Sequence, residues 1–122
     1  MFEIVPDNEL PYSVQGDTDV ANHYMRIKQC VYDGAFNENG RDRYSIMHEI
    51  SHYLLMSVYG FGFQRNLTNC TVKAYQDPEW QADCLAGELL IPYNLMKGKQ
   101  PDTIMVECKV SQAAALTQSR FL

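Results

Sequence analysis

The sequence predicts an α+β fold in which a short N-terminal sheet is followed by helices. Three observations support this order. Apolar and polar residues alternate over residues 24–32, which is the two-residue period of a half-buried strand. From residue 41 to residue 59 the apolar residues recur at steps of three and four, the period of a helix. A second helix is predicted over residues 77–90, because Asp77 and Pro78 have the chemistry of a helix start.

Length and composition indicate a single folded domain spanning residues 1–122. Hydrophobic residues make up 46% of the 122 residues and charged residues 20%, the balance of a globular protein rather than a disordered one. The formal net charge of −5 disfavours binding to nucleic acid, because that binding needs clustered lysine and arginine. No apolar run has the length of a membrane span, and the opening MFEIVPDNEL lacks the features of a signal peptide. We therefore expect a cytoplasmic protein that binds neither nucleic acid nor membrane.

The N-terminal part is expected to be extended structure around turns. A first strand is predicted at FEIV, residues 2–5. In the strand predicted over residues 24–32, Met25, Ile27 and Val31 share one face. The following DGAFNENG, residues 33–40, is rich in glycine, asparagine and aspartate and predicts a loop. Residues 1–16 have two alternative placements, inside the domain or across a cleft.

The first predicted helix has an apolar stripe of Met47, Ile50, Leu54 and Val58, and Gly60 is placed to end it.

The second predicted helix should bury Ala82, Leu85 and Leu89, and Pro92 limits it to about residue 90. Two shorter helices are predicted after it, one near residues 102–108 and one that opens at Ser111.

The cysteines are scattered along the chain without a CxxC pair, which excludes a zinc knuckle and a thioredoxin-like motif. We expect all four to be free thiols packed as small hydrophobes: Cys30, Cys70, Cys84 and Cys108.

HEISH, residues 48–52, is the stretch most directly connected with chemistry. Residues four apart on a helix are neighbours on one face, so His48 and His52 can offer two imidazole nitrogens to one metal ion. Glu49 would lie beside the metal, where its carboxylate can take a proton from a zinc-bound water. The alternative is a solvated helix face on which the histidines make ordinary hydrogen bonds.

A catalytic zinc needs a third protein ligand and an open position for water. Glu79 is the best candidate, because it lies in the first turn of the second helix and can approach the first. Asp83, four residues on, can accept a hydrogen bond from a ligating histidine and orient it. Glu79 could instead only complement the helix dipole. Glu88 is a rival ligand at the far end of the same helix.

Three blocks of sequence carry a resemblance to a known family: RYSIMHEISHYLL, EWQADCLAGELLIP and CKVSQAAALTQSR. In this order they resemble the ImmA/IrrE family of small zinc metallopeptidases, whose pattern is a HExxH helix, an ExxAxxFAxxLLMP block and a VSxxAA stretch. The resemblance covers the chain from about residue 24 to its end. It implies a zincin-like α+β domain with a small sheet beside the active-site helix. Its ligands then fall on His48, His52 and Glu79, and its catalytic glutamate on Glu49.

The sequence departs from the family pattern at Ser51, where glycine is usual, at Leu85 in place of phenylalanine, and at Ile91 in place of methionine. These changes alter the size of packing positions and leave the ligand set intact. The better-known relatives cut repressor proteins encoded nearby, often in mobile elements or stress responses. The resemblance therefore implies a protein or peptide substrate, and a repressor in particular.

Two hypotheses follow for the function. The first is a zinc-dependent endopeptidase in which Glu49 is the general base and a peptide lies along the edge of the sheet, beside the strand predicted at residues 24–32. The second is a zinc-containing regulatory module that binds its partner as an antirepressor without hydrolysis. Two histidines and a carboxylate also accept Mn²⁺ or Fe²⁺. The residue that would stabilise an oxyanion stays open among His23, Tyr75 and Tyr93.

Overall fold

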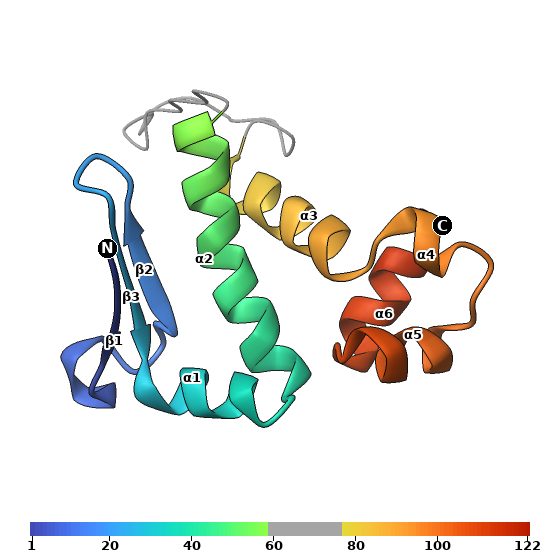
Figure 1. Cartoon of the computed structure of the whole chain (residues 1–122), viewed down its shortest axis with the longest axis horizontal. Helices are drawn as coiled ribbons and strands as arrows, with labels where there is room; N and C mark the ends of the chain where they lie inside the picture. The colour runs from blue at the N-terminus through green and yellow to red at the C-terminus, as the bar shows by residue number, and fades with distance from the viewer. Residues whose placement is uncertain (59–76) are drawn as a thin grey trace.

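The computed structural model describes residues 1–58 and 77–122, and these form an α+β arrangement (Figure 1). Three strands make one sheet: β1 (Phe2–Val5), β2 (Gly16–Asp19) and β3 (Tyr24–Lys28). Their order is β1-β3-β2, with β1 parallel and β2 antiparallel to β3. The central strand is therefore β3, and β2 is the edge strand beside the long helix α2 (Gly40–Val58). The predicted fold class is confirmed.

Helices make up most of the rest of the described chain. Besides α2 they are the 3-10 turn η1 (Asp7–Glu9) and helices α1 (Gln29–Phe36), α3 (Pro78–Leu90), α4 (Tyr93–Met96), α5 (Pro101–Cys108) and α6 (Gln112–Ser119). Figure 1 shows α2 between the sheet and the C-terminal helices, with α3 beside it.

The strand predicted over residues 24–32 is shorter than expected. It ends at Lys28, and α1 occupies Gln29–Phe36, where the end of the strand and part of a loop were predicted. Asp7 favours a helix over a strand at this point. Its carboxylate accepts a hydrogen bond of 2.9 Å from the backbone N–H of Cys30, in the first turn of α1. Val31 is buried in the helix, as it was expected to be in the predicted strand, so a short apolar pattern could not distinguish strand from helix.

The two long helices have nearly the predicted bounds. α2 runs from Gly40 to Val58, and the predicted cap Gly60 lies outside the described residues. α3 begins where predicted, since the Asp77 carboxylate accepts the backbone N–H of Glu79 at 2.9 Å. The predicted buried face of α3 is wrong in one respect, because Leu89 is 43% exposed.

The buried residues of α3 are small, which lets other elements approach it closely: Ala82, Ala86 and Gly87.

Apolar side chains gather in two clusters. Met25, Ile27 and Val31 form the first, against Ile46, Ile50 and Tyr53 of α2. The second joins the end of α3 to the C-terminal helices: Ile91, Met96, Ile104, Cys108, Val110 and Ala115. α2 thus has the sheet and α1 on one side and α3 on the other. The single domain proposed from length stays a prediction.

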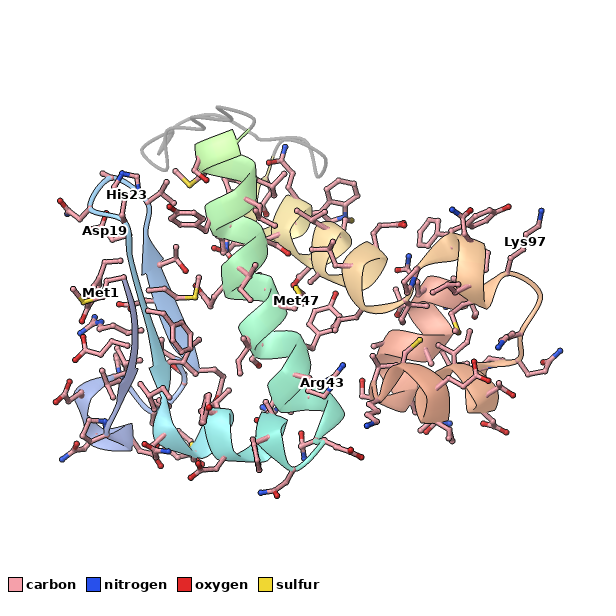
Figure 2. The ribbon with its side chains drawn as sticks, in the orientation of Figure 1. Met1, Asp19, His23, Arg43, Met47 and Lys97 are labelled. Carbon is pink, nitrogen blue, oxygen red and sulfur yellow. The ribbon has the colours of Figure 1, made fainter. Side chains whose placement is uncertain are left out.

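The C-terminal helices follow the sequence-based expectation with one addition. α5 matches the predicted helix at residues 102–108, and the Ser111 hydroxyl caps α6 by accepting the N–H of Ala114 at 3.2 Å. α4, which follows Pro92, was not predicted. Arg43 extends from α2 towards these helices (Figure 2) and donates to the Lys109 carbonyl at 3.0 Å.

The three cysteines within the described residues are free, as predicted, but only Cys108 is buried. Cys30 and Cys84 are exposed, so the prediction that they pack as small hydrophobes is wrong; Cys70 lies outside the described residues.

Among the described residues, no helix combines the length and apolar character needed to cross a membrane.

Candidate functional site

Two helices bring three side chains to one point. His48 and His52 project from the middle of α2, and Glu79 comes from the first turn of α3. The Nε2 atoms of the two histidines are 3.0 Å apart, and Glu79 Oε2 lies 2.9 Å from that of His48 and 3.2 Å from that of His52. The group is one that could hold a metal ion. His52 is buried, whereas Glu79 is largely open to solvent.

The contact of Asp83 with His48 fixes the orientation of the imidazole ring. Asp83 Oδ1 lies 2.7 Å from His48 Nδ1. The Asp83 carboxylate can accept a hydrogen bond from Nδ1, which directs the other ring nitrogen, Nε2, at Glu79. This orientation places Nε2 of His48 where it can act as a metal ligand, with Glu79 Oε2 beside it at 2.9 Å.

The spacing of the three donor atoms fits a metal ion. Ligands at about 2.0–2.1 Å from a tetrahedral zinc are separated from one another by about 3.3 Å. The triangle of His48, His52 and Glu79 has edges of 2.9, 3.0 and 3.2 Å, close to that separation. The residues present therefore fit a zinc-sized ion, and three protein ligands leave a fourth position for water or substrate.

Glu79 has the protonation state that a ligand requires. Partial burial raises the pKa of its carboxyl, but the charges and hydrogen bonds of His52 and His48 together outweigh burial and hold the pKa below the ordinary value. Glu79 is thus an ionised carboxylate at neutral pH.

Tyr44, one turn before His48 on α2, forms a hydrogen bond with the backbone of Asp83. Its hydroxyl donates to the Asp83 backbone carbonyl at 2.6 Å. Burial, with smaller contributions from the charges of Asp83 and Cys84, raises the pKa of Tyr44 to about 12. The phenol therefore stays protonated and keeps α3 attached to α2 at the level of His48.

Glu49 is bonded to the sheet and lines the same cleft as His48 and Glu79. The Thr18 hydroxyl on β2 donates to Glu49 Oε2 at 2.5 Å and lies 3.4 Å from the Glu49 carbonyl oxygen. Thr18 is buried. Gly16, two residues before Thr18, leaves no room for a side chain, because a Cβ there would lie 2.7 Å from the Arg26 carbonyl oxygen and 3.4 Å from Glu49 Cγ.

Sequence reasoning missed Thr18, because the four residues of β2, GDTD, carry no apolar alternation that would predict a strand.

A cleft of about 380 Å³ contains His48, Glu49, Glu79 and Asp83. The segment of residues 13–16 lines it on the side of β2. Of the two placements considered for residues 1–16, the structure shows the first: β1 is part of the sheet, and residues 13–16 form a wall of the cleft and do not cover it. The prediction that a peptide lies beside the strand at residues 24–32 is wrong, because β3 has a strand on each side and β2 is the edge at the cleft.

The rival residues lie elsewhere. Glu88 accepts a hydrogen bond from Gln118 Nε2 at 3.0 Å, at the end of α3 that contacts α6. His23 lies in the β2–β3 turn (Figure 2), where its Nδ1 is 3.1 Å from the Tyr53 hydroxyl. Tyr93 is in α4, with Lys97 over its ring. Neither His23 nor Tyr93 lines the cleft, and Tyr75 lies outside the described residues.

Residues 13–116 match the family model described as the IrrE N-terminal-like domain, Peptidase_M78. The match covers most of the chain. The chain belongs to this family. The resemblance to ImmA/IrrE proteins is thereby confirmed, and membership supports a metallopeptidase-like function acting on protein or peptide. Searches of curated proteins and of solved structures gave no significant match.

Proposed function

We propose that this protein is a zinc-dependent endopeptidase whose metal is held by His48, His52 and Glu79. The observation that carries the proposal is the convergence of three donor atoms from two helices, with mutual separations of 2.9, 3.0 and 3.2 Å. Family membership supports the same class of chemistry. Mn²⁺ and Fe²⁺ suit these ligands too, but zinc is the first choice for two imidazoles and one carboxylate.

When bound, zinc supplies Lewis acidity that makes water a nucleophile near neutral pH. Glu49 is the general base in this proposal. Its carboxylate takes a proton from the attacking water and later gives a proton to the leaving amine nitrogen. Asp83 holds His48 with Nε2 directed at the site, and Tyr44 holds the backbone of Asp83.

The substrate in this proposal is an extended segment of a protein, cut in the cytoplasm, with a transcriptional repressor as the expected target. Among the described strands β2 is bonded to β3 alone, and its other edge can pair with such a segment through backbone hydrogen bonds. Residues 14–16 bring this edge to the cleft that contains Glu49. Arg26 Nε on β3 donates a hydrogen bond of 2.9 Å to Asp17 Oδ1 on β2. These two charged side chains therefore neutralise each other, and neither needs a substrate group as its partner.

The test is hydrolysis of a complex peptide mixture by the zinc-loaded protein, with products identified by mass spectrometry. We expect new peptide termini that are absent after removal of the metal by a chelator and restored by stoichiometric zinc. A protein that binds one zinc per chain and holds a repressor without shortening it would instead be the antirepressor considered above, and the peptidase proposal would be wrong.

A second prediction concerns Thr18, whose hydrogen bond holds the carboxylate of the general base Glu49 in position. Thr18→Val is expected to lower kcat for hydrolysis by roughly 10-fold or more with little change in KM, since a hydrogen bond to a charged group contributes about 1.5–3 kcal/mol. Thr18→Ser keeps the hydroxyl and should retain most of the activity. Steady-state kinetics on one identified peptide measure both variants. Equal losses in the two variants would mean that Thr18 acts through packing and not through its bond to Glu49.

A further inference from the structure

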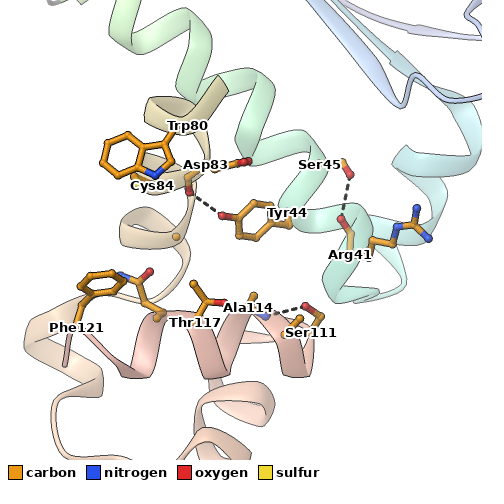
Figure 3. Close-up of a pocket in the computed structure, with 13 residues that line it drawn as sticks. Arg41, Tyr44, Ser45, Trp80, Asp83, Cys84, Ser111, Ala114, Thr117 and Phe121 are labelled. Atoms are coloured by element: carbon orange, nitrogen blue, oxygen red, sulfur yellow. Dashed lines mark hydrogen bonds between the residues drawn. The ribbon is translucent and has the colours of Figure 1, made fainter. Parts of the chain in front are cut away.

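A second hollow opens beside the cleft, between α2, α3 and α6 (Figure 3). Its volume is about 490 Å³, within the range of about 300–1,000 Å³ typical of ligand pockets. Tyr44, Ser45 and Asp83 line both this pocket and the cleft, so the two spaces share a wall. Two of these three residues orient His48, because Asp83 contacts that ring and Tyr44 holds the Asp83 carbonyl.

The pocket has aromatic sides. Trp80 from α3 and Phe121 beyond the end of α6 lie at one side of it, and Tyr44 extends towards α3 (Figure 3). Trp80 is 44% exposed and Phe121 is 67% exposed. Covering such surface with another apolar group is favourable at about 25 cal/mol per Å². The exposed rings therefore favour an apolar occupant over a polar one.

Three polar side chains in the wall already have partners inside the protein. The Tyr44 hydroxyl donates to Asp83, the Ser45 hydroxyl donates to the Arg41 carbonyl at 3.1 Å, and the Gln118 amide donates to Glu88 at 3.0 Å. A polar ligand group would have to compete with these bonds, whereas an apolar side chain would disturb none of them.

The floor of the pocket is set by a close approach of α3 and α6. A Cβ at Gly87 would lie 2.6 Å from Gln118 Oε1 and 3.8 Å from the Tyr44 hydroxyl. Gly87 is buried, and Gln118 is buried as well. The contact holds the two helices in place below the cavity, so the pocket is formed before a ligand binds.

We propose that this pocket binds a large apolar side chain of the substrate, such as leucine, methionine or phenylalanine, at a position next to the cleaved bond. The inference rests on the proposed peptidase function, and it adds a preference that the metal site alone does not provide. The shared wall gives the geometric reason: a peptide whose scissile bond reaches His48 and Glu49 can place a neighbouring side chain beyond Tyr44 and Asp83.

The test uses a peptide that the protein cleaves, synthesised with leucine or with alanine at each position flanking the cut. At one position we expect kcat/KM to be at least about 10-fold higher for leucine, the scale of selectivity that a hydrophobic pocket provides. Thr117→Phe, which adds a ring inside the pocket, should bring the ratio close to one. Leu116→Phe is the matched control, because this exposed neighbour on α6 does not line the pocket and should keep the ratio.

A ratio that Thr117→Phe leaves unchanged, or the absence of any leucine preference, would overturn the proposal. A binding measurement separates this failure from failure of the peptidase function itself. Trp80 is the single tryptophan of the chain, and it lines the pocket. We therefore expect saturable change of its fluorescence with millimolar acetyl-Ala-Leu-Ala-amide and none with acetyl-Ala-Ala-Ala-amide, in the Glu49→Gln protein as in the wild type.

Thr117→Phe should abolish the fluorescence response and Leu116→Phe should retain it. This result without any hydrolysis would support the pocket and reject the peptidase. Hydrolysis without a leucine-dependent response would reject the pocket alone.

Discussion

Glu49→Gln is expected to lower kcat for peptide hydrolysis by roughly 10²- to 10⁴-fold, the usual contribution of a general acid–base group. The amide cannot accept the proton of the attacking water, but its carbonyl oxygen can still accept the hydrogen bond that Thr18 makes to Glu49 Oε2 at 2.5 Å. The shape of the site and its metal ligands are therefore retained. The rate is measured on one peptide identified from the mixture, with metal content determined on the same sample.

Glu9→Gln is the matched control, because it removes one exposed carboxylate in η1, which does not line the cleft. It should leave kcat unchanged. An undiminished rate in Glu49→Gln at full metal content would exclude Glu49 as the base. Loss of metal from that variant would instead show that the residue supports the metal site.

Glu79→Ala is expected to weaken zinc binding by more than the roughly 10- to 100-fold that loss of an outer hydrogen-bond partner costs, because it removes a ligand atom outright. Asp83→Asn provides that smaller step: the asparagine keeps a hydrogen bond to His48 Nδ1 but lacks the negative charge that makes the ring a stronger ligand. Competition with a chromophoric chelator gives the dissociation constant for each protein.

Glu88→Ala controls for the removal of a carboxylate from the same helix. Glu88 bonds to Gln118 and lies outside the metal-capable group, so its loss should leave zinc affinity unchanged. The ligand assignment would be wrong if Glu79→Ala bound zinc as tightly as the wild type. If Glu88→Ala lost the metal, Glu88 would replace Glu79 as the third ligand.

Local patterns in the sequence were enough for the two helices that carry the site. The spacing of His48 and His52 places both on one face of any helix, whatever surrounds it. The Asp77–Pro78 start places Glu79 in the first turn of α3, since capping depends on neighbouring residues alone. The order of three sequence blocks was also sufficient for the family, which the match over residues 13–116 confirms.

Local sequence patterns did not predict the structure where it depends on residues far away in the sequence, either a pairing strand or a side chain that caps a helix. Residues 29–36 have apolar positions that suit a strand or a helix, and the Asp7 carboxylate, far away in sequence, bonds to the first turn of α1. β2 is too short to show a period, and it is a strand because it pairs with β3. Thr18 could not be assigned a role before that pairing was known.

The choice between Glu79 and Glu88, the bond from Asp83 to His48 and the pocket beside the cleft are all consequences of how α2, α3 and α6 pack. Sequence spacing ranks side chains along one helix, but it contains no distance between helices. That distance depends on small residues such as Ala82 and Gly87, which are buried where other elements approach α3. The residue types of a metal site are therefore readable from the sequence, whereas their meeting at one point is a property of tertiary packing.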